Sequence, residues 1–154
     1  MKLRIEDVVT RKVVTIDPDS SVKDATELME RYSISCLVVM SGSRVDGILT
    51  SRDVINRVVA LGFDPVHVHV KEAMTRPVVM MRADAFLEEA IKVMLQRKIK
   101  KIPLVGGNSE DLKLVGLLSL SDIVENHANI FSQLWEQTLM TIPADEGNNI
   151  FIVG

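Results

Sequence analysis

The chain has 154 residues, of which 47% are hydrophobic and 25% are charged, so it can bury a core and keep a polar surface. Its net charge of −3 disfavours general nucleic-acid binding, and no apolar run reaches the roughly 18–20 residues of a membrane span. The opening MKLRIEDVV lacks the apolar core of a secretion signal, and the single cysteine, Cys36, excludes an internal disulfide. We therefore expect a cytoplasmic protein.

The first 60 residues predict strand, helix, strand, strand and helix, in that order. KVVTI (12–16) is a β-branched run typical of a short strand, and residues 19–32 carry apolar side chains at helical spacing. Ser21 and Asp24 predict a capping box at the start of that helix. SCLVVM and VDGILT predict two strands, and SGSR predicts the turn between them. SRDVINRVVAL predicts a second helix.

The pattern then repeats. A shift of 65 places TRKVVTIDPD on TRPVVMMRAD, and after a four-residue insertion a shift of 69 places GILTSRDVI on GLLSLSDIV. The sequence therefore predicts an α/β (α+β) fold of two β-α-β-β-α copies, at 5–60 and 70–129, joined by a linker at 61–69. Each copy would be marginal alone, so we expect the two to pack on each other.

A C-terminal extension, residues 130–154, belongs to neither copy. IFSQLWEQTLM has apolar residues at helical spacing and predicts a helix, and PADEGNN predicts a turn or linker. The terminal IFIV is typical of a core segment or an edge strand and less often of a segment that docks a partner.

The repeated phrase places Thr50 three residues before Asp53, and Ser119 three residues before Asp122. One interpretation is a capping box at the helix start, which is worth about 1 kcal/mol and needs no ligand. The other is a ribonucleotide site, because a helix N-terminus suits phosphate and a carboxylate can accept from both hydroxyls of a ribose diol. The two interpretations are compatible, since a capped helix keeps free lone pairs.

Other chemistry is weakly supported. His67 and His69 alternate on an extended segment, but no cysteine or carboxylate is close enough in sequence to complete a zinc site, so we expect no metal. Cys36 is interpreted as a small buried hydrophobe. No nucleophile elbow, P-loop or dense cluster of catalytic residue types is present, and we expect the chain not to be an enzyme.

Residues 5–129 resemble a tandem pair of CBS (cystathionine β-synthase) domains, a Bateman module. The matching segments are VVTRKVVTIDPDSSVKDA, GILTSRDVI, VKEAMTRPVV, KIKKIPLV and GLLSLSDIV. The resemblance implies two small α/β units related by a pseudo-twofold axis, two clefts that take adenosine-containing ligands, and a homodimer. One departure is Val38, which stands where the second copy has the more typical Pro103.

The resemblance also implies two pockets, each drawing on both copies. In one, Asp122 binds ribose and Ser119 faces phosphate or ribose; its lining residues are Thr10, Thr15, Ser35, Cys36 and Leu117. In the other, Asp53 binds ribose beside Thr50; its lining residues are Ile48, Thr75, Met80, Lys100 and Lys101. The two lysines could neutralise phosphates, or they could form a solvated run with their ammonium groups in water.

The two implied nucleotide pockets indicate a regulatory function. The chain is expected to be a regulatory, energy-sensing module that binds AMP, ADP or ATP, or alternatively S-adenosylmethionine or NAD. An adenine nucleotide would be a regulatory ligand, no cofactor would be obligatory, and an unidentified protein partner would read the change in conformation. The alternative is a dimerising interaction protein with empty clefts that docks partners through Trp135 and IFIV.

Overall fold

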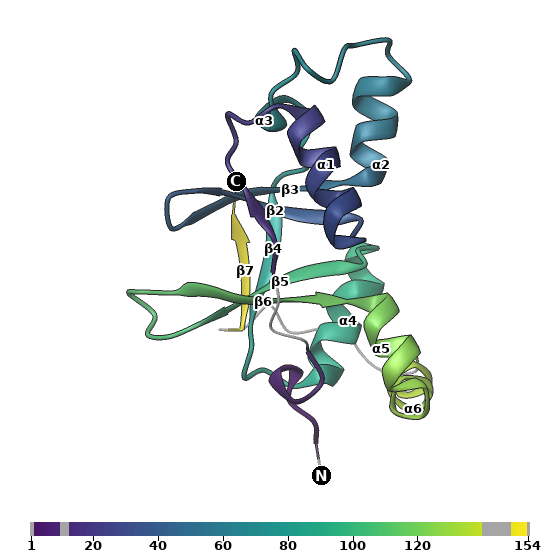
Figure 1. Ribbon diagram of the computed structural model, residues 1–154. Coiled ribbons are helices and arrows are strands. Elements are labelled where there is room, and N and C mark those ends of the chain that lie inside the picture. The colour runs from purple at the N-terminus through teal and green to yellow at the C-terminus, as the bar shows by residue number, and fades with distance from the viewer. Residues whose placement is uncertain (1, 10–12, 140–148, 154) are drawn as a thin grey trace. The chain divides into compact units, whose positions relative to one another are not determined.

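The computed structural model describes residues 2–9, 13–139 and 149–153, and its backbone contacts divide the chain into two compact units. We call the unit formed by residues 13–78, with which residues 152–153 also group, the N-unit. The C-unit is formed by the described residues of 1–12 and 79–151. Each unit contains most of one copy of the repeat and one small mixed sheet (Figure 1). The predicted α/β class is therefore confirmed.

The N-unit has a three-stranded sheet in the order β1-β2-β3, with β1 parallel and β3 antiparallel to the central β2. Its elements are β1 (Thr15–Ile16), α1 (Val22–Tyr32), β2 (Cys36–Ser41), β3 (Arg44–Thr50), α2 (Ser51–Val54), the π-helix η2 (Ile55–Val59) and α3 (Val70–Ala73). The short helix α3 lies at the start of the segment that the sequence assigned to the second copy.

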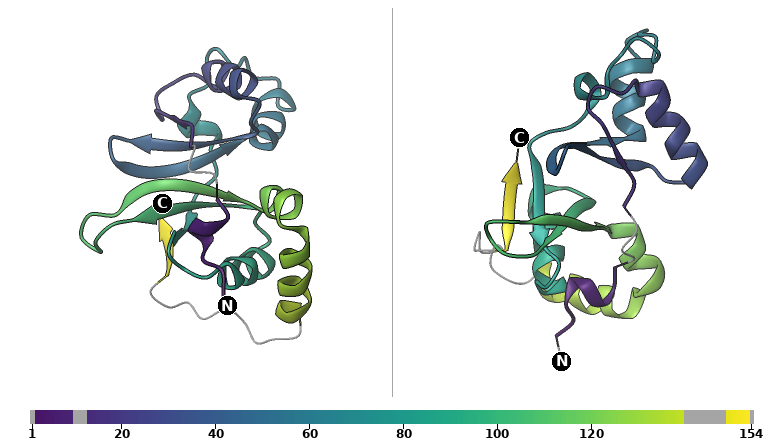
Figure 2. Two further views of the ribbon diagram at one scale, coloured as in Figure 1. Left: turned by 60° about the horizontal axis from the view of Figure 1, so that its bottom comes forward. Right: turned by 60° about the vertical axis from the view of Figure 1, so that its left-hand side comes forward.

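The C-unit repeats this plan and adds a strand, giving a four-stranded sheet in the order β6-β5-β4-β7 (Figure 2). Its elements are the 3-10 helix η1 (Ile5–Asp7), β4 (Val78–Arg82), α4 (Leu87–Arg97), β5 (Lys101–Gly106), β6 (Lys113–Ser119), α5 (Leu120–Asn126), α6 (Ala128–Leu139) and β7 (Ile150–Val153). The terminal IFIV segment is thus a strand next to β4, as its composition indicates.

Local sequence explains where the first helix begins and ends. The Ser21 hydroxyl accepts a hydrogen bond from the Asp24 amide at 3.0 Å, which satisfies one free donor of the first turn. Val22, Ala25 and Met29 lie on the buried face at helical spacing. The helix ends at Ser33, whose φ of 52° is left-handed, and Lys98 ends α4 in the same way at 55°.

The departure at Val38 changes how the strands pair. In the N-unit the Val38 amide donates to the Val14 carbonyl at 3.2 Å, and pairing of β1 with β2 begins at Thr15 and Val38. Pro103 stands at the matching position of β5 and has no amide hydrogen to donate. Pairing of β4 with β5 accordingly begins one residue later, at Met81 and Leu104.

The segment that enters the second copy packs on the first copy. The Val22 amide donates to the Val68 carbonyl at 2.8 Å, and the Val70 amide donates to the Ser20 carbonyl at 2.8 Å. These bonds hold α3 against the start of α1. Residues 66–78 therefore group with the N-unit, so the compact units have different boundaries from the sequence repeats.

The N-terminal segment makes the matching contacts in the C-unit. The Leu87 amide donates to the Leu3 carbonyl at 2.9 Å, and the Ile5 amide donates to the Ala85 carbonyl at 2.9 Å. Each of these four residues is 65 positions from its counterpart in the N-unit. The repeat in sequence is thus also a repeat in hydrogen bonding, with η1 in the place of α3.

The extension packs against the C-unit. Ile130, Phe131, Leu134 and Trp135 of α6 and Ile150 of β7 lie against the core formed by α4 and the sheet. The rings of Phe131 and Trp135 have centroids 5.2 Å apart. None of the helices in the described residues is both long and apolar enough to cross a membrane.

Candidate functional site

The first candidate site lies where β3 ends and α2 begins. The Asp53 amide donates to the Thr50 hydroxyl at 3.1 Å, and the Thr50 amide donates to the Asp53 carboxylate Oδ2 at 3.0 Å. This is a complete capping box. The capping interpretation of the repeated phrase is therefore confirmed for the first copy.

Asp53 has further partners through its other oxygen. The Thr75 hydroxyl donates to Asp53 Oδ1 at 2.9 Å, and Arg57 Nη1 lies 3.9 Å from the same oxygen. The Asp53 side chain is 13% exposed, while that of Arg57 is 46% exposed. The carboxylate is thus largely enclosed by groups that suit its negative charge.

Thr75 reaches Asp53 because its segment pairs with β3. The Ile48 amide donates to the Thr75 carbonyl at 3.0 Å, and the Thr75 amide donates to the Ile48 carbonyl at 2.7 Å. The neighbouring Gly47 allows this close approach. A Cβ at Gly47 would lie 2.6 Å from Met74 Sδ and 3.1 Å from the Thr75 carbonyl oxygen.

The second copy of the phrase has a different geometry. Ser119 precedes α5 but makes no side-chain capping bond. Instead, its hydroxyl accepts from Lys101 Nζ at 3.0 Å, and Ser119 is 5% exposed. The Asp122 side chain is exposed, and within the described residues no hydrogen bond or ion pair engages its carboxylate. The capping interpretation is therefore wrong for Ser119 and Asp122, since the hydroxyl accepts from Lys101 and makes no capping bond.

The carboxylates of Asp53 and Asp122 can both accept further hydrogen bonds. An ionised carboxylate accepts hydrogen bonds through two lone pairs on each oxygen. Asp53 uses one on Oδ2 for the Thr50 amide and one on Oδ1 for Thr75, so one on each oxygen remains. Asp122 is exposed at the first turn of α5. Both carboxylates can therefore accept bonds from vicinal hydroxyls.

The remaining predicted residues are divided between the units, each of which is described by itself. In the N-unit, Cys36 is buried and pairs in register with Thr50, whereas Thr15 and Ser35 are exposed. In the C-unit, Lys101 pairs in register with Ser119. Met80 is buried, Leu117 is half-buried and Lys100 is exposed. Thr10 lies outside the described residues.

The structure thus brings together two sets of predicted residues. Thr50, Asp53, Thr75 and Ile48 meet in the N-unit, and the sequence assigned all of them to one pocket. Lys101 and Ser119 meet in the C-unit, although the sequence assigned them to different pockets.

Arg57 is the functional candidate that the sequence analysis missed. Its Nη1 donates to the carbonyls of Ala73 at 2.9 Å and Met74 at 2.6 Å. These carbonyls are at the C-terminal end of α3, where helix carbonyls lack intrahelical partners. The available signal was the spacing of four residues from Asp53, which places both side chains on one helical face.

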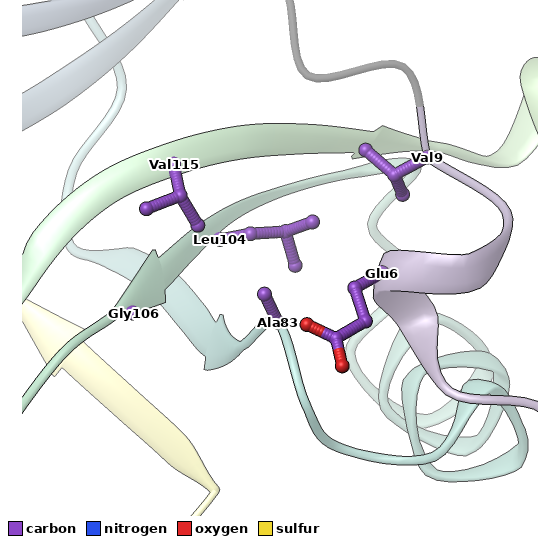
Figure 3. Close-up of a pocket in the computed structure, with 6 residues that line it drawn as sticks. All are labelled: Glu6, Val9, Ala83, Leu104, Gly106 and Val115. Atoms are coloured by element: carbon purple, nitrogen blue, oxygen red, sulfur yellow. The ribbon is translucent and has the colours of Figure 1, made fainter.

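Two further cavities lie inside single units. A groove of about 610 Å³ lies between α1 and the start of α2 in the N-unit, and Ser35 is among its lining residues. A smaller cavity of about 150 Å³ in the C-unit is lined by Glu6, Val9, Ala83, Leu104, Gly106 and Val115 (Figure 3). Among the described residues of that lining, Glu6 is the one that carries a charge.

One of the two histidines, His69, has a structural explanation. His69 precedes α3, where its amide donates to Glu72 Oε2 at 2.8 Å and its Nδ1 lies 2.9 Å from the Asp19 carbonyl oxygen. Among the described residues, no three histidine, cysteine, aspartate or glutamate side chains gather in a way that could hold a metal ion.

Comparison with known proteins defines the family. The model of the CBS domain family matches residues 5–60 and again residues 70–129. These two matches cover most of the 154 residues. The chain therefore belongs to the CBS-domain family and carries a tandem pair of CBS domains.

Individual relatives agree with this assignment. The chain is 33% identical over 123 residues to inosine-5'-monophosphate dehydrogenase of Methanocaldococcus jannaschii, covering 79% of this chain and 23% of that enzyme. This chain therefore spans about a quarter of the length of that enzyme. It is 30% identical over 122 residues to the CBS domain-containing protein YhcV of Bacillus subtilis, covering 79% of this chain and 84% of YhcV.

The solved structures give the same fold. A hexameric CBS-CP12 protein from bloom-forming cyanobacteria superposes with a TM-score of 0.75 and 30% sequence identity, over 86% of this chain and 75% of that one. CBS pairs are regulatory, ligand-binding modules, and the dehydrogenase match extends only over the CBS part of that enzyme.

Proposed function

We propose that this CBS pair is a regulatory module whose ligand is an adenosine-containing nucleotide. The ligand would act as a signal, with no obligatory cofactor and no reaction on the chain. A protein partner would respond to the conformation that the ligand favours. The free energy available for that response is the difference in ligand affinity between the two conformations.

The observation that supports this proposal is the environment of the Asp53 carboxylate. It is held by Thr50 and Thr75 at 3.0 and 2.9 Å, and two of its lone pairs are left for a ligand. A carboxylate with this orientation is an acceptor for hydroxyl groups and repels anions. Ribose, with adjacent 2′- and 3′-hydroxyls, is the nucleotide part that fits it.

The proposed ligand class also needs a partner for phosphate. Lys100 is exposed and Lys101 is half-buried, and both are in the C-unit. Because Lys101 donates to Ser119 at 3.0 Å, it would have to share its remaining donors with a phosphate. We therefore propose Lys100 as the first phosphate contact that the C-unit offers and Lys101 as the second.

Calorimetric titration with AMP, ADP, ATP, S-adenosylmethionine and NAD tests the proposal. Wild type should bind at least one of them with micromolar affinity. Asp53→Asn and Asp122→Asn should each remove one class of site. Asp24→Asn is the matched control, because Asp24 is an exposed carboxylate on α1 and belongs to neither phrase. No heat with any compound would refute the proposal, as would equal affinity in all three variants.

The alternative, partner docking through the extension, has less support. Trp135 and Ile150 pack against the core of the C-unit instead of projecting from it. Asn149 also joins the extension to the C-unit, because its side-chain amide donates to Glu89 Oε2 at 3.1 Å. A partner that required these residues would have to displace them from their own unit.

A further inference from the structure

We propose that Arg57 is a positioning residue for the Asp53 site, which it prepares for the ligand by holding residues 73–75 against β3. This inference rests on the proposed function, because it concerns the same site. It adds a residue from outside the repeated phrase. It also predicts that the two sites of the pair differ in how far they are formed before a ligand arrives.

The contacts of Arg57 connect three parts of the N-unit. Its Nη1 donates to Ala73 and Met74, the last residues before Thr75. The same nitrogen lies 3.9 Å from Asp53 Oδ1. One guanidinium nitrogen therefore faces both the end of α3 and the carboxylate of the site. Arg57 itself belongs to η2, the π-helical turn that follows α2.

This arrangement determines where the Thr75 hydroxyl lies. With Ala73 and Met74 held by Arg57, Thr75 pairs with Ile48 and donates to Asp53 Oδ1 at 2.9 Å. That bond orients the carboxylate, so its free lone pairs have a defined direction. A ligand that binds a group already held in place loses less conformational freedom on binding.

The second copy lacks the equivalent residue. Asn126 is the counterpart of Arg57 after the shift of 69. Its side-chain amide donates to the Asp122 carbonyl at 3.1 Å, within its own helix. Among the described residues, it therefore makes no link to another segment comparable to that of Arg57. The Asp122 carboxylate is also exposed, whereas Asp53 is 13% exposed.

The first arm of the test needs no ligand. Exchange of the Thr75 amide, which donates to Ile48 at 2.7 Å, should be about tenfold faster in Arg57→Ala if Arg57 holds this segment. Arg52→Ala is the matched control, since Arg52 is exposed on the same helical segment. Exchange in Arg52→Ala should equal that of wild type. Unchanged exchange in Arg57→Ala would overturn the inference.

The second arm measures AMP affinity in an Asp122→Asn background, so that one site is titrated. Arg57→Ala and Thr75→Val should each weaken binding about tenfold, and the double variant should be no weaker than the worse single variant. Arg57→Lys should recover part of the loss, because an ammonium can still donate to the two carbonyls. Thr75→Ser should recover most of it, because the hydroxyl is kept.

The outcomes separate this inference from the proposed function. If wild type binds AMP, Asp53→Asn abolishes binding and Arg57→Ala changes nothing, the function stands and the role of Arg57 is wrong. Additive losses in the double variant would show that Arg57 acts apart from Thr75, and would also overturn the inference. If wild type binds none of the five compounds, the proposed function fails first, and the role of Arg57 in a ligand site fails with it.

Discussion

Gly47→Ala tests whether close approach of residues 74–75 to β3 is what builds the Asp53 site. The added Cβ would lie 2.6 Å from Met74 Sδ, 3.0 Å from Met74 Cγ and 3.1 Å from the Thr75 carbonyl oxygen. Met74 is 6% exposed, so its side chain has little free space into which to move. The substitution should therefore push the whole segment away from the strand.

The magnitude follows from two opposing effects. Overpacking of a filled core costs about 1–3 kcal/mol. Alanine restricts the unfolded chain more than glycine does, which returns about 0.4–1 kcal/mol where the backbone conformation suits it. Gly47 lies in β3 and its φ is not positive, so alanine can adopt its backbone conformation. We therefore expect Gly47→Ala to lower the free energy of unfolding by about 1–2 kcal/mol.

The second copy supplies the control. A Cβ at Gly116 would lie 3.4 Å from both Leu104 Cδ1 and Val9 Cγ1, which is an ordinary contact distance. Gly116→Ala should therefore change the free energy of unfolding by less than about 0.5 kcal/mol. Urea unfolding followed by circular dichroism measures both variants, and amide exchange of Thr75 reports on the segment itself.

A third variant separates steric crowding from a general loss of stability. Met74→Ala removes both side-chain atoms that a Cβ at position 47 would meet most closely. In that background Gly47→Ala should cost about 1 kcal/mol less than in wild type. Equal cost in the two backgrounds, or equal destabilisation by Gly47→Ala and Gly116→Ala, would show that contact with residues 74–75 is not the cause of the destabilisation.

Three further predictions concern single interactions, each measured as the free energy of unfolding. Ser21→Ala removes the capping acceptor of α1 and should cost about 1 kcal/mol. The Arg82 guanidinium donates to Asp84 at 3.1 Å and lowers the pKa of that carboxyl. Asp84→Asn should therefore cost at most about 1 kcal/mol at neutral pH, and the cost should disappear as the pH falls below about 4 and the wild-type carboxyl takes up its proton. Val38→Pro removes the amide that pairs β2 with the segment before β1 and should lower the free energy of unfolding by about 1 kcal/mol. A control substitution at an exposed strand position should leave the free energy of unfolding unchanged.

The sequence predicted the regular elements because their signals are local. Apolar spacing placed α1 at its observed residues, and the left-handed Ser33 and Lys98 end matching helices before matching strands. The repeated phrase also predicted the capping box of Thr50 and Asp53. All of these features depend on residues within a few positions of one another.

The features that the sequence could not predict depend on contacts between distant segments. The pairing of Ile48 with Thr75 joins residues 27 positions apart, and nothing in either segment alone specifies it. The bond between Lys101 and Ser119 depends on the register of β5 with β6, which also places a lysine where the capping partner was expected. Arg57 can bind the end of α3 because α3 packs against the rest of the N-unit, and that packing is tertiary structure.

A calorimetric titration of wild type and Asp53→Asn with AMP and with 2′-deoxy-AMP tests whether Asp53 binds the ribose of an adenosine nucleotide. Wild type should bind AMP at least about tenfold more tightly than 2′-deoxy-AMP, because the deoxy compound loses one hydrogen bond to a charged acceptor. Asp53→Asn should remove most of this difference. Equal affinity of wild type for the two nucleotides, or an undiminished preference in Asp53→Asn, would show that Asp53 does not bind the ribose.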